Sequence, residues 1–327
     1  MQTVWEERLQ VEVQERLRRL FRGQPTHLRN SASRYFREHG RRLVRRRRQA
    51  AVSPFWLLAP GWYLTSREQR GILHDLLYAQ YCLLLTIRIH DDLLDAQATD
   101  SWLILVGDDL LVEAQTVFEQ HSRGHAQSIV GSAVRTSLYA IADVDRLQRA
   151  SRGMPISARG LYADVAAVFS VAAGAALARL NRYDEYRTFR RFASDLSIAS
   201  QLLDDLADVE EDAAHGRLNV AAAMLIGSPR LAVRCRNQRF RRQLIARRIA
   251  SEGAAESLLD LTIAHVHRAA RTARRLSVSQ AGEYARAMER ECNQLREVMH
   301  HTRVDVMLGD LARHRVVAGT RPGRVRV

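Results

Sequence analysis

The stretch HDDLLD, residues 90–95, ends a run of apolar, helix-forming sequence, and a second acidic stretch, QLLDDLADVEED, follows at residues 201–212. Carboxylates are costly to bury without a counter-charge, so their position beside apolar helical runs needs a reason. On a helix, residues four apart differ by roughly 40° in direction and about 6 Å in height, and so share one face. Each stretch therefore predicts a stripe of carboxylates.

The first predicted stripe contains Asp91 and Asp95, and the second contains Asp204, Asp208 and Asp212. Like charges at this spacing repel, so neither stripe is there to stabilise its helix. Magnesium prefers a few carboxylate oxygens and completes its shell with water and substrate phosphates. A single Asp-Asp pair is more typical of a solvated face or an N-cap. Two stripes that each follow an apolar run instead favour a magnesium clamp for a diphosphate.

Length and composition favour an all-α fold. The chain has 327 residues, of which 46% are hydrophobic, with 6 prolines and 17 glycines. Ala, Leu, Arg and Glu are frequent, while alternating β-branched stretches bounded by turn residues are scarce. We expect a single bundle of about ten helices over residues 1–310, including the basic N-terminal helices, with the two stripes facing each other across its centre. Residues 311–327 are predicted to be a basic, disordered tail.

Periodicity and breaker residues place the helices. Glu68 and Gln69 stand where a capping box would begin a long helix at Thr65 or Ser66 that runs into the first acidic stretch. Breaks are predicted at residues 23–25 and around Pro54 and Pro60. The remaining helices are expected at residues 5–22, 26–51, 102–121, 126–149, 157–180, 183–212, 231–250, 254–275 and 279–302.

The formal net charge is +14, and all fifty basic residues are arginine, which excludes any site that needs a lysine. Such a charge suggests a polyanionic partner: nucleic acid, an anionic membrane or a phosphorylated substrate. No nucleic-acid reading module, zinc site or aromatic-interleaved basic strand is present, so nucleic acid is not the expected partner. The arginine runs at residues 16–22, 41–48 and 313–326 are interpreted as a solvated helix face and a disordered end.

The cysteines and the N-terminus indicate a soluble, cytoplasmic protein. Cys82, Cys235 and Cys292 are far apart without paired spacing and are predicted to be reduced core residues. The first ten residues are charged and lack the apolar region of a signal peptide. No uninterrupted apolar run reaches the about 18 residues that a membrane span needs.

Five elements, in order, resemble the trans-polyprenyl diphosphate synthases of the class I isoprenoid synthase superfamily. They are HDDxxD at 90–95, GDxLLxxA at 107–114, a middle helix with Tyr162, AAVF at 166–169 and Gly174, QxxDDxxD at 201–208, and GRLN at 216–219. The match runs from Gln69 to Ala223, and its order and spacing are more specific than either acidic stretch alone. The resemblance implies the all-α isoprenoid synthase fold, a trinuclear magnesium centre and an allylic prenyl diphosphate substrate.

The resemblance also implies roles for individual residues. Seven aspartates would hold magnesium. The first and the last aspartate of each aspartate-rich motif would be catalytic. The metal set is Asp91, Asp92, Asp95, Asp204, Asp205, Asp208 and Asp212, with Asp91, Asp95, Asp204 and Asp208 as the catalytic members. Asp92 and Asp205 would be ligands or outer hydrogen-bond acceptors. Arg88, Arg159, Arg217 and Gln201 would bind the substrate, since guanidinium groups suit a departing diphosphate.

Several positions depart from the resembled family where it binds a second substrate, isopentenyl diphosphate. The histidine expected before the first motif is Leu84, the mid-helix lysine falls on Asp164, and the Arg-Arg-Gly after Asp95 is missing. The Gly-Lys-x-x-Arg element has only a distorted counterpart in GRRLVR at 40–45. A diphosphate far from the metals needs cationic side chains, and an acid repels it. The second-substrate half of the site is therefore predicted to be largely missing, while the metal half is kept.

These departures make a class I terpene synthase the leading hypothesis: an enzyme that ionises one allylic diphosphate and lets the cation cyclise or lose a proton. The spacing of Asp204, Asp208 and Asp212 also resembles the metal triad of terpene cyclases, whereas His90 is more typical of the elongating synthases. One alternative is a trans-prenyltransferase whose N-terminal arginines replace the missing cations. Another is a non-catalytic regulatory subunit. An anionic membrane and a second copy of the chain stay open as partners.

Overall fold

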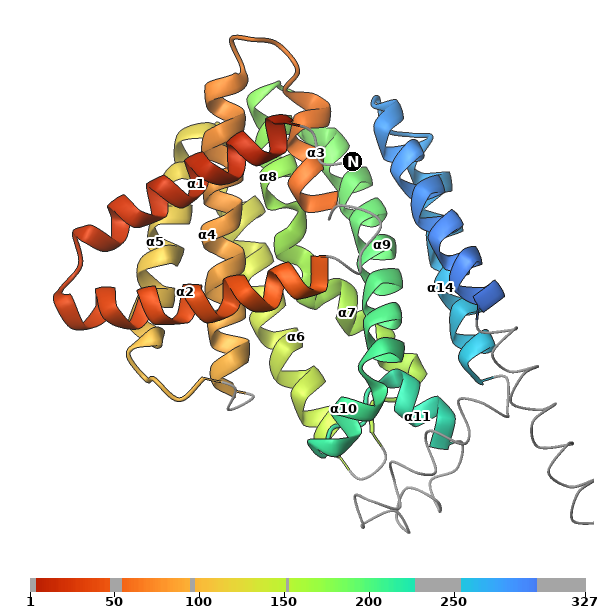
Figure 1. Ribbon diagram of the computed structural model, residues 1–327. Coiled ribbons are helices and arrows are strands. Elements are labelled where there is room, and N and C mark those ends of the chain that lie inside the picture. The colour runs from red at the N-terminus through yellow and green to blue at the C-terminus, as the bar shows by residue number, and fades with distance from the viewer. Residues whose placement is uncertain (1–3, 48–54, 95–97, 151–152, 227–253, 299–327) are drawn as a thin grey trace, which may run out of the picture. The chain divides into compact units, whose positions relative to one another are not determined.

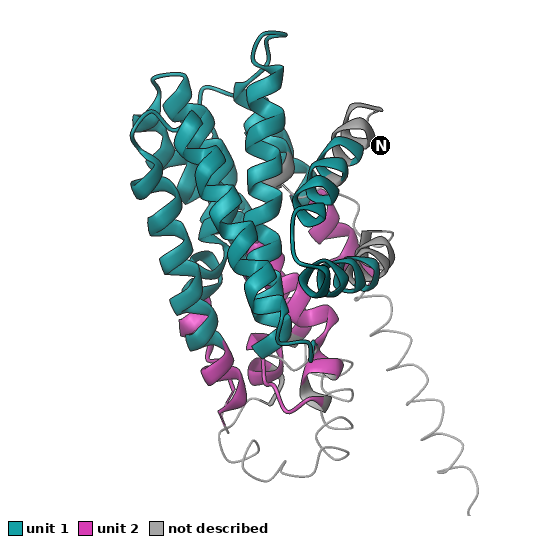
Figure 2. Ribbon diagram, turned by 90° about the vertical axis from the view of Figure 1, so that its left-hand side faces the viewer, with its two compact units in different colours: residues 1–144, 160–198, 265–288 teal, residues 145–159, 199–264, 289–327 magenta. Residues whose placement is uncertain are grey.

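The computed structural model describes residues 4–47, 55–94, 98–150, 153–226 and 254–298. Within these ranges the secondary structure is helical and contains no strand, which confirms the all-α prediction (Figure 1). The chain divides into two compact units, each assembled from three segments (Figure 2). The first unit comprises residues 1–144, 160–198 and 265–288, and the second comprises residues 145–159, 199–264 and 289–327.

The first unit is built around α4 (Arg70–Leu94), which packs along α5 (Leu103–His121). Helix α8 (Val171–Arg179) contacts both of them, and α3 (Phe55–Tyr63) contacts α4 and α8. The hairpin of α1 (Val4–Arg22) and α2 (Thr26–Arg47) crosses this pair, with α1 on α4 and α2 on α5 (Figure 1). The helices meet through fully buried apolar side chains, among them Leu76, Leu83, Leu110, Phe118 and Leu177.

The predicted capping box at the start of the long helix is confirmed. The backbone N–H of Gln69 donates to Ser66 Oγ over 3.3 Å, and the backbone N–H of Ser66 donates to Gln69 Oε1 over 3.2 Å. This reciprocal pair satisfies backbone groups that the first helical turn leaves open. Helix α4 follows directly and runs to Leu94, as the sequence predicted.

The helix predicted at 157–180 is present but irregular. It consists of η2 (Ile156–Arg159), α7 (Gly160–Val165), η3 (Ala166–Ser170) and α8. The buried Gln80 amide of α4 donates to the carbonyl oxygen of Val168 over 2.9 Å and accepts the N–H of Ala172 over 3.0 Å. A side-chain amide from a neighbouring helix thus satisfies the hydrogen bonding of backbone groups at the irregular turn.

The other predicted helices are found with small shifts of their ends. They are η1 (Gln127–Gly131) with α6 (Ser132–Arg149), η4 (Tyr183–Glu185) with α9 (Tyr186–Ala207), α10 (Val209–Ala214), α14 (Ala254–Ala273) and a helix at 279–298. The single helix predicted at 183–212 is interrupted at Asp208. The helix predicted at 231–250 and the basic tail lie outside the described residues, and the single-domain organisation stays a prediction.

Two helices were not predicted. The break expected around Pro60 is wrong, because α3 contains Pro60 and continues until Leu64 donates its N–H to the Pro60 carbonyl over 3.0 Å, while Pro54 lies outside the described residues. Burial of Ala59, Tyr63 and Leu64 favours the helix and offsets the N–H that proline lacks. The second is α11 (Val220–Ile226), which depends on a cap described below.

The predicted character of two cysteines is confirmed. Cys82 and Cys292 are buried and free, and burial raises the pKa of both thiols, to about 11 for Cys292. Cys235 lies outside the described residues. Two helical stretches, Arg70–Leu94 and Ile156–Arg179, are long and apolar enough to cross a membrane, but 61% and 72% of the respective windows are buried inside the protein. Buried core helices meet the same criterion, so this is weak evidence for a membrane span.

Candidate functional site

The first acidic cluster, Asp91 and Asp92, lies at the C-terminal end of α4 in the first unit. The Asp91 side chain is 39% exposed, whereas Asp92 is 2% exposed. Arg88 pairs with both, at 3.2 Å from Asp91 Oδ2 and 2.8 Å from Asp92 Oδ1. The hydroxyl of the buried Tyr35 on α2 donates to Asp92 Oδ2 over 2.9 Å. Asp92 thus accepts a hydrogen bond on Oδ2 and forms an ion pair at Oδ1, and Asp91 is the more exposed of the two aspartates.

The GD element at 107–108 lies beside this cluster. Thr86 Oγ1 donates to the carbonyl oxygen of Gly107 over 3.0 Å, and His90 Nε2 lies 3.9 Å from Asp108 Oδ1. A Cβ atom on Gly107 would lie 3.3 Å from His90 Nε2, so glycine permits the close approach of α5 to α4. Asp95, the last residue of the motif, lies outside the described residues.

The second acidic cluster, which comprises Asp204, Asp205, Asp208 and Asp212, lies in the second unit where α9 passes into α10. Although the helix is interrupted at Asp208, the Asp208 N–H donates to the Asp204 carbonyl and the Asp212 N–H to the Asp208 carbonyl, both over 2.8 Å. These bonds keep the helical spacing on which the predicted stripe depends. Asp204 is exposed, Asp208 is half-buried and Asp205 is 2% exposed.

Asp205 and Asp212 are held by the segment that follows α10. The carboxylate of Asp205 accepts the Val220 N–H over 3.0 Å and a longer bond from Gln201 over 3.3 Å. The fully buried Asn219 donates through Nδ2 to the Asp205 carbonyl oxygen and to Asp212 Oδ2, over 3.0 and 2.8 Å. Asn219 Oδ1 accepts the Ala222 N–H over 2.9 Å and thereby caps α11.

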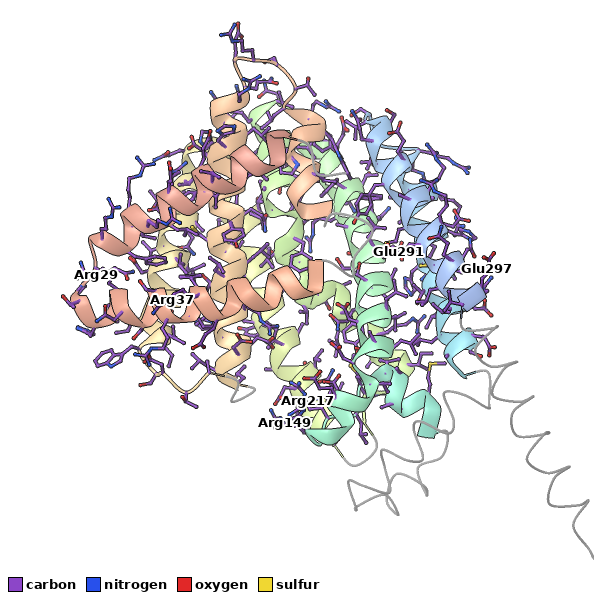
Figure 3. All side chains as sticks on the ribbon, in the orientation of Figure 1. Arg29, Arg37, Arg149, Arg217, Glu291 and Glu297 are labelled. Carbon is purple, nitrogen blue, oxygen red and sulfur yellow. The ribbon has the colours of Figure 1, made fainter. Side chains whose placement is uncertain are left out.

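The loop that carries Arg217 is fixed by its backbone. The Leu218 N–H donates to the Gln148 carbonyl, and the Met154 N–H donates to the Leu218 carbonyl, both over 2.8 Å. Gly153 has φ +70°, and a Cβ atom there would lie 2.5 Å from the Leu218 Cβ atom, so the approach requires glycine. Arg217 Nη2 lies 3.2 Å from Asp212 Oδ1. Figure 3 shows Arg217 near Arg149, at the end of α6.

The remaining predicted substrate residues have local contacts. Arg159 Nη1 donates to the Ile156 carbonyl oxygen over 2.9 Å, within η2. Arg88 and Arg217, predicted to bind the diphosphate, each pair with an aspartate of their own cluster. Leu84 is half-buried on α4. Asp164 is exposed as a residue, but partial shielding of its carboxyl group raises its pKa, against the opposite effect of Arg190.

The chemistry of the donors fits magnesium, a hard cation that takes carboxylate oxygens. The carboxylates that are open, in the sense of solvent exposure, are Asp91 and Asp204, and Asp208 is half-buried. Among the residues that the structure describes, no group of three or more His, Cys, Asp or Glu side chains is gathered as a metal site. The first cluster belongs to the first unit and the second cluster to the second unit, so their apposition stays a prediction.

Sequence reasoning missed two residues of these clusters. Asn219 lies within GRLN, so a signal existed, but its capping and bridging contacts were not predicted. No sequence pattern indicates Tyr35, because it belongs to α2 and contacts a carboxylate 57 residues further on.

No protein-family model matches the chain, and no curated protein matches it. Solved structures of prenyl synthases do. The octaprenyl pyrophosphate synthase of Helicobacter pylori is 12% identical with a TM-score of 0.64, over 87% of this chain and 99% of that one. The heptaprenyl diphosphate synthase of Staphylococcus aureus is 11% identical with a TM-score of 0.67, over 86% and 97%. A polyprenyl synthase of Caulobacter crescentus, complexed with calcium and isoprenyl diphosphate, is 18% identical with a TM-score of 0.57, over 72% and 81%.

The chain therefore has the all-α isoprenoid synthase fold of the trans-polyprenyl diphosphate synthases, as the sequence predicted. At identities this low, the similarity shows the fold, and the activity has to be argued from the site.

Proposed function

We propose that the protein is a magnesium-dependent prenyltransferase that binds and ionises an allylic prenyl diphosphate and transfers the prenyl group to an acceptor. The similar structures favour prenyl transfer over cyclisation, which the departures at the second-substrate positions favour. The observation that carries the proposal is the paired design of the acidic clusters. In each, an open aspartate precedes an anchored one, at the positions where the resembled family has its two aspartate-rich motifs.

Asp91, Asp204 and Asp208 would hold magnesium, and Asp95 and Asp212 would be further ligands. Bound magnesium would supply positive charge to the leaving diphosphate. Asp92 and Asp205 would fix the orientation of the clusters. Arg88, Arg159 and Arg217 would bind diphosphate oxygens, since guanidinium groups match them in geometry and charge. For Arg88 and Arg217 this requires the arginine to share or exchange its present aspartate partner.

The reaction would break the allylic C–O bond, with the electron pair leaving on the diphosphate. Buried apolar side chains of α4 and α8, such as Leu83 and Leu177, would exclude water and offer the cation no nucleophile. The acceptor double bond would then attack the allylic carbon, and a proton would be lost.

A specific observation favours the terpene synthase as a second candidate. Leu84 and Asp164 stand where the resembled family has a histidine and a lysine for isopentenyl diphosphate. Both differences remove positive charge, and partial burial raises the pKa of the Asp164 carboxyl group, against the opposite effect of Arg190. Losing one charge-assisted contact costs roughly 1.5 to 3 kcal/mol, so losing two would weaken a second diphosphate site by orders of magnitude.

Product analysis tests the proposal. The full-length protein is incubated with magnesium and geranyl, farnesyl or geranylgeranyl diphosphate, each with and without isopentenyl diphosphate. A diphosphate longer by one isoprene unit supports prenyl transfer. A hydrocarbon or alcohol with the carbon count of the substrate supports the terpene synthase.

Absence of product from every substrate would contradict both enzymes. Activity that returns only with a second synthase would identify a regulatory subunit. Fractionation of cells and sedimentation of the purified protein would test the proposed cytoplasmic location and the homodimer.

A further inference from the structure

We infer that Tyr35, on the N-terminal helix α2, is a positioning residue for the first acidic cluster. The inference rests on the proposed function, because positioning matters only if the cluster holds a metal and a diphosphate. It makes the α1–α2 hairpin a part of the site, which nothing in the arginine-rich sequence of these helices indicates.

The contact is buried at both ends. Tyr35 is 6% exposed and Asp92 is 2% exposed, and 2.9 Å separates the hydroxyl from Asp92 Oδ2. The other carboxylate oxygen lies 2.8 Å from Arg88 Nη2. Rotation of the Asp92 carboxylate would break the hydrogen bond from Tyr35 and weaken the ion pair with Arg88, which is costly for a buried charge.

Arg88 connects this anchor to the open aspartate. Its second nitrogen, Nη1, lies 3.2 Å from Asp91 Oδ2, a longer separation than its contact with Asp92. Asp91 is also the exposed partner, so it can leave Arg88 for a cation at less cost than Asp92 can. Tyr35 therefore holds Asp92, Asp92 holds Arg88, and Asp91 is left as the exchangeable ligand.

The hairpin is tied to α4 and α5 at several further points. Arg16 of α1 pairs with Asp75 at 2.5 Å and stacks 3.8 Å from the centre of the Tyr78 ring. Gln24 donates to Asp109 of α5 over 2.5 Å. Phe21 of α1 and Phe36 of α2 stack with ring centroids 5.1 Å apart. These contacts hold α2 in place, so the position of the Tyr35 hydroxyl is set by the fold of the first unit.

The test variant is Tyr35→Phe in the full-length protein, which keeps the ring and removes the hydroxyl. The control is Tyr63→Phe, because Tyr63 is equally buried and its hydroxyl has no hydrogen-bond partner among the described residues. Mn²⁺ is titrated in the presence of inorganic pyrophosphate, and the free ion is measured by electron paramagnetic resonance. Outer partners of metal ligands typically change metal affinity tenfold or more, so Tyr35→Phe should weaken Mn²⁺ binding about tenfold.

The control should bind Mn²⁺ as the parent does. In steady-state assays, Tyr35→Phe should raise the magnesium concentration needed for half-maximal rate while saturating magnesium restores most of kcat, a split that a general loss of folding would not produce. In an Asp92→Asn background, Tyr35→Phe should have little further effect on Mn²⁺ binding.

Unchanged Mn²⁺ binding in Tyr35→Phe, together with normal product formation by the parent, would overturn this inference alone. Equal weakening in Tyr35→Phe and Tyr63→Phe would also overturn it, because packing would then be the cause. If the parent binds Mn²⁺ and Tyr35→Phe weakens that binding but the parent yields no product, the proposed function fails while the positioning role stands.

Discussion

The two acidic clusters share one plan but differ in what anchors them. In both, an open aspartate precedes one that is 2% exposed: Asp91 before Asp92, and Asp204 before Asp205. Asp92 is anchored by the side chains of Tyr35 and Arg88. Asp205 is anchored chiefly by a backbone N–H, from a residue only 15 positions further on.

The difference shows two ways to keep a carboxylate buried and oriented. A backbone N–H is set by the local fold of the loop and cannot be removed by a side-chain substitution. A side-chain donor from another helix depends on tertiary packing and is removed by a single change. The first cluster should therefore respond to substitutions far away in the sequence, and the second to substitutions within its own loop.

The largest expected effect comes from the open aspartates. Asp91→Asn and Asp204→Asn keep the size of the side chain and remove its charge, so each should lower turnover about a hundredfold or more while the fold stays intact. The double variant should lose much less than the product of the two losses if both clusters serve one diphosphate. Asp184→Asn, at an exposed aspartate of the first unit, is the matched control. Fully multiplicative losses would mean that the clusters act separately.

Asn219→Ala should have the next largest effect, on stability. It removes the cap of α11 and the donors to the Asp205 carbonyl and Asp212, so the free energy of unfolding should fall by about 2 kcal/mol in urea titrations. Asn219→Ser keeps an acceptor for the cap and should lose less. The exposed Asn30→Ala should change stability by less than about 0.5 kcal/mol. A neutral Asn219→Ala would contradict the local anchoring of the second cluster.

Much of the fold followed from local sequence. The Ser66–Gln69 capping box begins the long helix, and the acidic stretches mark its end and that of α9, since such signals act within a few residues. Helix α3 was missed because burial outweighs the missing N–H of Pro60. Propensity ranks residues in isolation and does not include that burial.

The candidate site was predictable only in part. Asp92 and Asp205 were expected as ligands or outer acceptors, and their burial fits the second role. Arg88 and Arg217 were expected to bind diphosphate, and their pairing with aspartates was not predicted, although Arg88 and Asp92 have the i, i+4 spacing of a helical ion pair. The contact of Tyr35 with Asp92 depends on how α2 packs against α5, and a tertiary contact of this kind leaves no spacing pattern.

A third prediction compares how much stability is lost when each of the two arginines is replaced. Arg88→Gln leaves the buried Asp92 with less counter-charge and should lower the free energy of unfolding by about 1–2 kcal/mol, since a buried carboxylate without its cation is costly. Arg217→Gln acts on Asp212, which is 17% exposed and also bonded to Asn219, and should cost about half as much. Urea titrations measure both. A larger loss for Arg217→Gln would show that the second cluster depends on its arginine more than the first cluster does.

The smallest expected effect concerns Asp164, an acid outside both clusters whose carboxyl group is shielded and for which the described residues supply no anchoring donor of the kind that Asp92 and Asp205 have. Its pKa is raised by that shielding, so the folded state disfavours the charged form. The resulting loss of stability is absent below the unfolded pKa of about 3.9, grows between the unfolded and the folded pKa, and is complete above the folded pKa. Asp164→Asn should therefore stabilise the protein at pH 7 relative to pH 3, by no more than about 0.5 kcal/mol, because water screens an exposed residue. Melting temperatures of the parent and the variant across this range test the sign. A parent that gains stability over the variant as the pH rises would show that Asp164 has an anchoring partner. Asp164 would then no longer contrast with the anchored Asp92 and Asp205.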